Sequence, residues 1–169
     1  DAPARGDSFR DHAQEPPTVS YRSHVSNVGW MSTVANGNTS GVVGSKNAIE
    51  ALSPRVTWYG HGGAISSRAH VSGISWQNWS SGTIGTTGQS RSIEAVQFKL
   101  NGEISTAYDI WYRVYASGLG GWLGWASNGV PAGSTAKSVG IQGVQILLVE
   151  KGSSAPGGTT CHFVGVTDT

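Results

Sequence analysis

The sequence YRSHVSNVGW, at residues 21–30, returns twice more along the chain in altered form. Its tryptophan, Trp30, is followed by Trp76 and Trp122 at steps of 46 residues. In the first copy glycines follow Trp30 at offsets of 7, 11 and 14, and Glu50 follows at an offset of 20. The chain is therefore a threefold tandem repeat, in which each unit buries its apolar face against its neighbours.

The composition indicates an all-β protein. Charged residues make up 12% of the chain and it holds 25 glycines in 169 residues, which predicts many turns with positive φ. No window has convincing helical periodicity, and no apolar run approaches the roughly 18 residues that a membrane span needs. The net charge of +1 comes without a basic cluster, so we expect neither nucleic acid binding nor membrane insertion.

Period-two alternation predicts the first long strand of the repeat. Val19, Tyr21, Ser23 and Val25 would share one face of a strand, which places Arg22 and His24 together on the opposite face.

A second strand begins at Ile93 in the middle repeat and has counterparts in the other two. Alternation would place Ile93 and Ala95 on one face of this strand, and Glu94 on the other face with Val96 and Phe98. We therefore expect the glutamate to lie among apolar side chains.

Asn-Gly pairs, Asn36-Gly37 and Asn128-Gly129, lie between the strands in two of the copies. This pair is typical of two-residue hairpin turns, in which both central residues have positive φ. Two folds with pseudo-threefold symmetry suit three such all-β units. We favour a β-trefoil, with a β-prism as the alternative.

The chain divides into three parts. We predict a flexible tail at 1–17, a single domain of three repeats at 18–151, and a glycine-rich linker with a C-terminal tail at 152–169. The apolar residues 162–166 could pair as an edge strand. The repeats span about 18–58, 64–101 and 108–151.

The ends of the chain suggest secretion. The start Asp1-Ala2-Pro3-Ala4 lacks methionine and is typical of a mature protein after signal-peptide removal, so we expect an extracellular location. Cys161 is the only cysteine, which excludes an internal disulfide and leaves a homodimer as one candidate assembly. The tripeptide Arg5-Gly6-Asp7 matches the integrin-recognition sequence, but so short a match recurs by chance.

The repeat resembles a known family. His24-Val25, Gly29-Trp30, Asn36-Gly37 and Ile49-Glu50-Ala51, with the spaced glycines, are similar to the hydrophobic repeat with a Gly-Trp pair of clostridial surface proteins, the ChW repeat. The resemblance covers about 130 of the 169 residues. It implies a secreted or surface-displayed bacterial protein, and a related three-repeat actinobacterial haemagglutinin implies a lectin. The implied partners are glycans, with galactose- and deoxyhexose-type sugars as the candidates.

The chemistry of sugar binding selects the site residues. An aromatic ring supports the apolar face of a sugar, while carboxylate, amide and imidazole groups pair with its hydroxyls. Each repeat offers such a set. The predicted sugar-binding residues are His24, Trp30, Asn36 and Glu50 in the first copy, His70, Trp76, Trp79 and Glu94 in the second, and Trp122, Trp125, Asn128 and Gln142 in the third.

Several of these residues also have a structural interpretation. The repeated Trp30, Trp76 and Trp122 suit the core of each unit, whereas Trp79 and Trp125 are better platforms because the first copy has Thr33 there. The glutamates and histidines could serve as buried hydrogen-bonding groups instead. The third copy has Tyr115 for histidine and Gln142 for glutamate, so we expect it to bind differently.

Other functions fit the sequence less well. The few acids form no recognisable catalytic pair, and no His or Cys cluster has metal-ligand spacing, so we expect neither an enzyme nor a metal or other cofactor. The alternative to a lectin is a protein-binding or cell-wall adhesion module.

Overall fold

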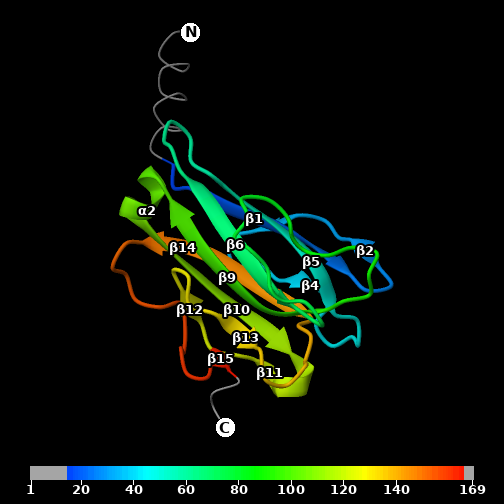
Figure 1. Ribbon diagram of the computed structural model, residues 1–169. Helices are drawn as coiled ribbons and strands as arrows, with labels where there is room; N and C mark the ends of the chain where they lie inside the picture. Colours follow the sequence, from blue (N-terminus) through cyan, green and yellow to red (C-terminus); the bar gives the residue numbers. More distant parts are fainter. Residues whose placement is uncertain (1–14, 166–169) are drawn as a thin grey trace.

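The computed structural model describes residues 15–165, and its long strands run alongside one another across the molecule (Figure 1). The strands form three five-stranded sheets. The first sheet contains β1 (Thr18–Val25), β2 (Gly29–Trp30), β3 (Val34–Ala35), β5 (Ile49–Thr57) and β8 (Ile84–Gly85). The second contains β4 (Ser40–Gly41), β10 (Tyr108–Ala116), β11 (Gly121–Trp122), β12 (Ala126–Ser127) and β14 (Gly143–Glu150). The third contains β6 (Ala64–Val71), β7 (Ser75–Trp76), β9 (Ile93–Asn101), β13 (Ala132–Ser134) and β15 (Phe163–Val164).

Within the described residues, helical structure is confined to two short segments, α2 (Glu103–Ala107) and the 3-10 turn η1 (Ser117–Leu119). Within residues 15–165, no helix combines the length and the hydrophobicity that crossing a bilayer requires.

Each repeat is built on one antiparallel pair of long strands: β1 with β5, β6 with β9, and β10 with β14. In β1 the buried positions alternate with accessible ones, as predicted, because one face packs on the core and the other meets solvent. Arg22 and His24 lie on the outer face. The inner faces of all three pairs meet in one shared hydrophobic core.

Short strands join each repeat to a neighbour. Strand β8 of the second repeat pairs with β5 of the first, β13 of the third pairs with β9 of the second, and β4 of the first pairs with β14 of the third. The same exchange thus occurs three times in a cycle. The prediction of an all-β fold with three pseudo-threefold repeats is confirmed. No strand pairing closes the three sheets into the barrel of a trefoil among the described residues.

One glycine in each exchanged strand permits this pairing. Gly41, Gly85 and Gly133 have φ of 102°, 83° and 118°. An added Cβ atom would meet a backbone carbonyl oxygen of the neighbouring repeat. The distance would be 2.3 Å from Gly41 to Gln142, 2.2 Å from Gly85 to Glu50 and 2.4 Å from Gly133 to Glu94. Only a residue without a side chain allows the two backbones to approach so closely.

The two Asn-Gly turns form, but the predicted hairpins do not, because β3 pairs with β1 and β4 with β14, while β12 pairs with β10 and β13 with β9. Asn36 and Gly37 have φ of 48° and 88°, and Asn128 and Gly129 have 49° and 90°. Both central residues are therefore in the left-handed conformation that a type I′ turn requires.

The alternation predicted for the second long strand is wrong. Ile93, Val96 and Phe98 are all buried in the core, whereas Ala95 lies opposite His70 on the outer face. The register shifts at this point, because Val71 is opposite Ile93 and Glu94 is the additional residue of a β-bulge. The bulge resets the phase of the strand, so Ile93 can enter the core on the same side as Val96.

The C-terminal residues behave as an edge strand, as expected, since β15 pairs in parallel with β13. The predicted flexible tail falls mostly on residues 1–14, and the tripeptide Arg5-Gly6-Asp7 with it. These residues lie outside the part of the chain that the structure describes.

Candidate functional site

The outer face of the first sheet brings together four side chains, three polar ones and one tryptophan. Strand β2 folds back on β1 and pairs Trp30 with His24. The two rings meet edge to face with centroids 5.4 Å apart, and the guanidinium of Arg22 lies 4.5 Å from the indole centroid. Trp30 is 38% exposed, so the expectation that it fills the core is wrong.

The β-bulge supplies the fourth group. The extra residue interrupts the alternation of side chains between the two faces of the strand. Glu50 therefore turns toward the outer face while Ile49 enters the core. The carboxylate of Glu50 then lies 3.1 Å from Nδ1 of His24. We call this group of Arg22, Trp30, His24 and Glu50 the tryptophan cluster of the first repeat.

The second repeat has the same cluster. His70 Nδ1 lies 2.9 Å from Glu94, the His70 and Trp76 rings meet edge to face at 5.3 Å, and the guanidinium of Arg68 lies 4.8 Å from the Trp76 ring. The side chains of His70 and Glu94 are only 15% and 7% exposed. Trp76 is half-buried and lies outside the core cluster.

The third repeat keeps the ring contacts and changes the hydrogen bonds. Tyr115 packs edge to face on Trp122 at 5.5 Å, and Arg113 lies 4.5 Å from the Trp122 ring. The Gln142 side chain instead accepts a hydrogen bond from the Ser117 N–H at 2.9 Å. Trp122, like Trp76, is half-buried and outside the core. Gln142 thus binds the backbone of η1.

The second tryptophan of the later repeats is covered by its neighbours. Trp79 is half-buried between Arg68, 5.3 Å from its ring centroid, and the ammonium of Lys99, at 4.1 Å. Trp125 is only 7% exposed, and its backbone N–H donates to the Gly158 carbonyl of the C-terminal segment. Neither ring offers the open platform that the sequence suggested.

The turn asparagines lie apart from the tryptophan clusters. The side-chain oxygens of Asn36 and Asn128 accept hydrogen bonds from the backbone N–H groups of Val19 and Ile110, both at 3.1 Å. Val19 is near the opposite end of β1 from His24. These contacts anchor the turn to the long strand, so the structure does not bring the two asparagines together with the other predicted site residues.

Sequence reasoning missed the arginines. Arg22, Arg68 and Arg113 stand at the same place on the three first strands, and each places its guanidinium within 5 Å of the repeat tryptophan. The signal was present, because an arginine recurs two residues before each histidine or its tyrosine counterpart. Burial lowers the pKa of Arg113 from its ordinary value.

Another aromatic group lies between the first two repeats. Trp58 stacks on His61 with centroids 3.8 Å apart, and His61 Nδ1 lies 2.6 Å from Glu103. Hydrogen bonds from the Gly62 N–H and from His61 hold the pKa of Glu103 below its usual value. Trp58 is half-buried.

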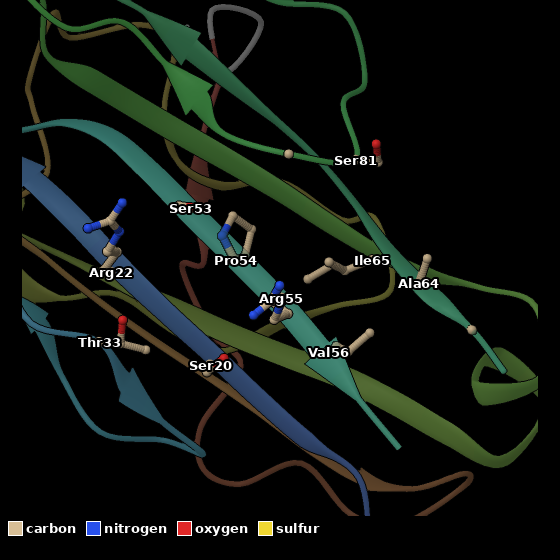
Figure 2. Close-up of a pocket in the computed structure, with 12 residues that line it drawn as sticks. Ser20, Arg22, Thr33, Ser53, Pro54, Arg55, Val56, Ala64, Ile65 and Ser81 are labelled. Atoms are coloured by element: carbon tan, nitrogen blue, oxygen red, sulfur yellow. The ribbon is translucent and has the colours of Figure 1, made fainter. Parts of the chain in front are cut away.

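Two open grooves occur beside these groups. One, of about 490 Å³, lies along β1, β5 and β6 and is lined by Arg22, Thr33 and Arg55 among others (Figure 2). The other, of about 500 Å³, is lined by Trp58, Tyr59 and His61. In the part of the chain that is described, no three His, Cys, Asp or Glu side chains gather to hold a metal ion.

Comparison with known proteins gives one family. The model of the clostridial hydrophobic W family, ChW, matches residues 24–57, 70–102 and 120–150. Comparison with curated proteins and with solved structures gave no significant match. Each matched segment contains one repeat tryptophan and the glutamate or glutamine that follows it. The chain therefore belongs to the ChW family and carries three copies of its repeat.

Proposed function

We propose that this protein is a secreted, non-catalytic lectin that binds glycans through its tryptophan clusters. The observation that carries the proposal is the recurrence of one outward-facing group, arginine, tryptophan, histidine and glutamate, in the first two repeats. A partly exposed indole next to charged hydrogen-bonding groups suits a sugar, which has an apolar C–H face and a rim of hydroxyls.

The histidine–glutamate pair would determine which histidine ring nitrogen donates a hydrogen bond and which accepts one. When Nδ1–H of His24 donates to Glu50, the other ring nitrogen, Nε2, carries a lone pair and accepts a hydrogen bond. A sugar hydroxyl can donate to that nitrogen, and the arginine can donate to a sugar oxygen. No metal is needed for these contacts.

The third repeat would act differently. Tyr115 presents a hydroxyl in place of the imidazole, and Gln142 already binds the Ser117 N–H. A neutral group makes weaker hydrogen bonds than a charged one, so this repeat contributes least to binding. Two or three weak sites on one chain then give useful affinity only for a multivalent glycan surface.

A protein-binding or cell-wall adhesion module is the second candidate. The exposed Val28 and Ile74, 55% and 43% accessible, each precede a cluster tryptophan by two residues and favour an apolar contact there. In that case a macromolecular ligand binds, and free monosaccharides do not compete with it.

The test combines a glycan array with indole NMR. The seven tryptophans give seven indole N–H signals, which single Trp→Phe variants assign. Galactose or a deoxyhexose that binds should shift the signals of Trp30 and Trp76 and leave that of Trp111 in place. Trp30→Ala should remove the response of the first repeat, and Trp58→Ala serves as the matched control. The proposal fails if folded protein binds no saccharide on the array and no indole signal responds.

A further inference from the structure

The groove of about 490 Å³ occurs where the first repeat departs from the other two. It runs between the outer face of β1 and β5 and the start of β6, and the Ser81–Gly82 segment forms its far side (Figure 2). Its volume is within the range of small-molecule sites. None of the predicted site residues lines it.

In the second repeat two side chains fill the equivalent place. Trp79 covers Arg68, and Gln97 spans the gap to the next repeat. Its side-chain oxygen accepts from Nε of Arg68, and its amide nitrogen donates to the Gly129 carbonyl at 2.9 Å.

The third repeat is filled in the same way. Trp125 covers Arg113, and Gln145 accepts from Arg113 Nε at 2.8 Å and donates to the Thr39 hydroxyl at 2.9 Å. The arginine is therefore held between tryptophan and glutamine in both repeats.

The first repeat has lost both filling side chains. Thr33 follows Trp30 by three residues, as Trp79 follows Trp76, and Ser53 follows Glu50 by three, as Gln97 follows Glu94. Thr33 and Ser53 are too short to reach across, so the space between the first two repeats stays open and both residues line the groove.

The open space exposes two positive charges. Ser20 is opposite Arg55 and Arg22 is opposite Ser53, so Arg22 and Arg55 are diagonal neighbours on one face of the ladder. Both are exposed, and among residues 15–165 no carboxylate forms an ion pair with either guanidinium. Unlike Arg68 and Arg113, Arg22 has no glutamine to occupy its Nε.

The lining of the groove suits a polyhydroxylated anion. A guanidinium binds a carboxylate through two parallel N–H donors. Around the arginines stand the hydroxyls of Ser20, Ser53 and Ser81, which can exchange hydrogen bonds with sugar hydroxyls, and the Val56 side chain adds an apolar surface. We propose that this groove is a further site, for a sugar that carries a carboxylate, of the uronic acid type, and that it exists only in the first repeat. It shares Arg22 with the tryptophan cluster of that repeat.

The proposal goes beyond the tryptophan clusters. It is tested with a matched pair of probes, galacturonate and galactose, which differ only at C6, where galacturonate has a carboxylate and galactose a hydroxymethyl group. The amide signals of Thr33 and Ser53 report on the groove, and the Trp76 indole signal reports on the cluster of the second repeat. Galacturonate should shift the groove signals saturably and bind there at least about tenfold more tightly than galactose.

Two variants test the assignment to this groove. Arg55→Gln should weaken galacturonate binding about tenfold, whereas Lys99→Gln, which removes a charge from the equivalent strand position of the second repeat, should not. The double variant Thr33→Trp with Ser53→Gln restores the filling side chains of the other repeats and should abolish binding in a folded protein.

The outcomes are distinct. Unchanged galacturonate affinity in Arg55→Gln, or an equal loss in Lys99→Gln, would overturn the proposal. Acetate or sulfate binding as tightly as galacturonate would show a simple anion site and overturn the sugar assignment. A silent Trp76 indole signal with intact groove binding would count against the lectin clusters and leave this site standing.

Discussion

Replacing Gly85 by alanine should destabilise the whole domain, because this glycine lies where a strand of the second repeat enters the sheet of the first. Its φ is +83°, and an added Cβ would lie 2.2 Å from the carbonyl oxygen of Glu50 and 2.9 Å from Cα of Ala51. The Thr86 N–H donates to that same carbonyl at 2.9 Å. The methyl group must push β8 away from β5 and weaken this hydrogen bond.

Three costs contribute. A left-handed conformation costs an ordinary residue roughly 1–2 kcal/mol, the hydrogen bond is worth about 1 kcal/mol, and overpacking costs about 1–3 kcal/mol. We therefore expect Gly85→Ala to lower the free energy of unfolding by about 3–6 kcal/mol. For a protein of this size each kcal/mol lowers Tm by roughly 2–4 °C.

The chain provides a matched control in the same repeat. Gly88 has a φ of +74°, yet a Cβ there would meet nothing within 4 Å. Gly88→Ala should therefore cost only the roughly 1–2 kcal/mol of backbone strain.

Urea denaturation followed by tryptophan fluorescence measures both variants. Equal losses for Gly85→Ala and Gly88→Ala, within about 0.5 kcal/mol, would refute the reasoning, since the close approach of the two backbones would then contribute nothing.

Three further outcomes are expected. Glu94→Gln keeps an acceptor for Nδ1 of His70 and should lower the free energy of unfolding by about 1 kcal/mol at most. Glu94→Ala leaves a largely buried imidazole without its partner and should lower it by about 1–3 kcal/mol. Equal urea midpoints for the two variants would contradict this. Burial raises the pKa of Tyr21 from 10.0 to about 12, so the stability that depends on the neutral phenol is complete below about pH 10 and is lost as the pH rises toward 12. Between about pH 9 and about pH 11 the loss should be roughly 1 kcal/mol in the native protein and smaller in Tyr21→Phe, as urea titrations at those two pH values would show. Neither a chelator nor Cys161→Ser should reduce haemagglutination, and loss with the serine variant alone would mean that a covalent dimer supplies the valency.

Local signals predicted much of the fold. The alternation of β1 and the positive φ of the Asn-Gly turns depend on neighbouring residues only, and both are confirmed. The strand exchange could not be predicted in this way, because β4 and β8 have two residues each and show no periodicity. Their pairing depends on contacts between distant parts of the chain.

The site was harder to predict than the fold. The bulge at Glu94 reverses the expected facing of Ile93, and a one-residue phase change moves every later side chain to the other face. The accessibility of Trp30 and Trp125 is the reverse of that expected, since it depends on which segment covers each ring. The C-terminal segment covers Trp125, whereas among residues 15–165 no equivalent segment covers Trp30.

The cyclic exchange of short strands has a consequence for how the molecule unfolds. In a linear array of repeats the end units have one neighbour, need polar caps and fray first. Here β4 of the first repeat pairs with β14 of the last, so every unit both gives and receives a strand. The ring has no end from which fraying can start, and loss of any one repeat would leave two interfaces open. We therefore expect a single cooperative transition, in which the two grooves and the three tryptophan clusters disappear together.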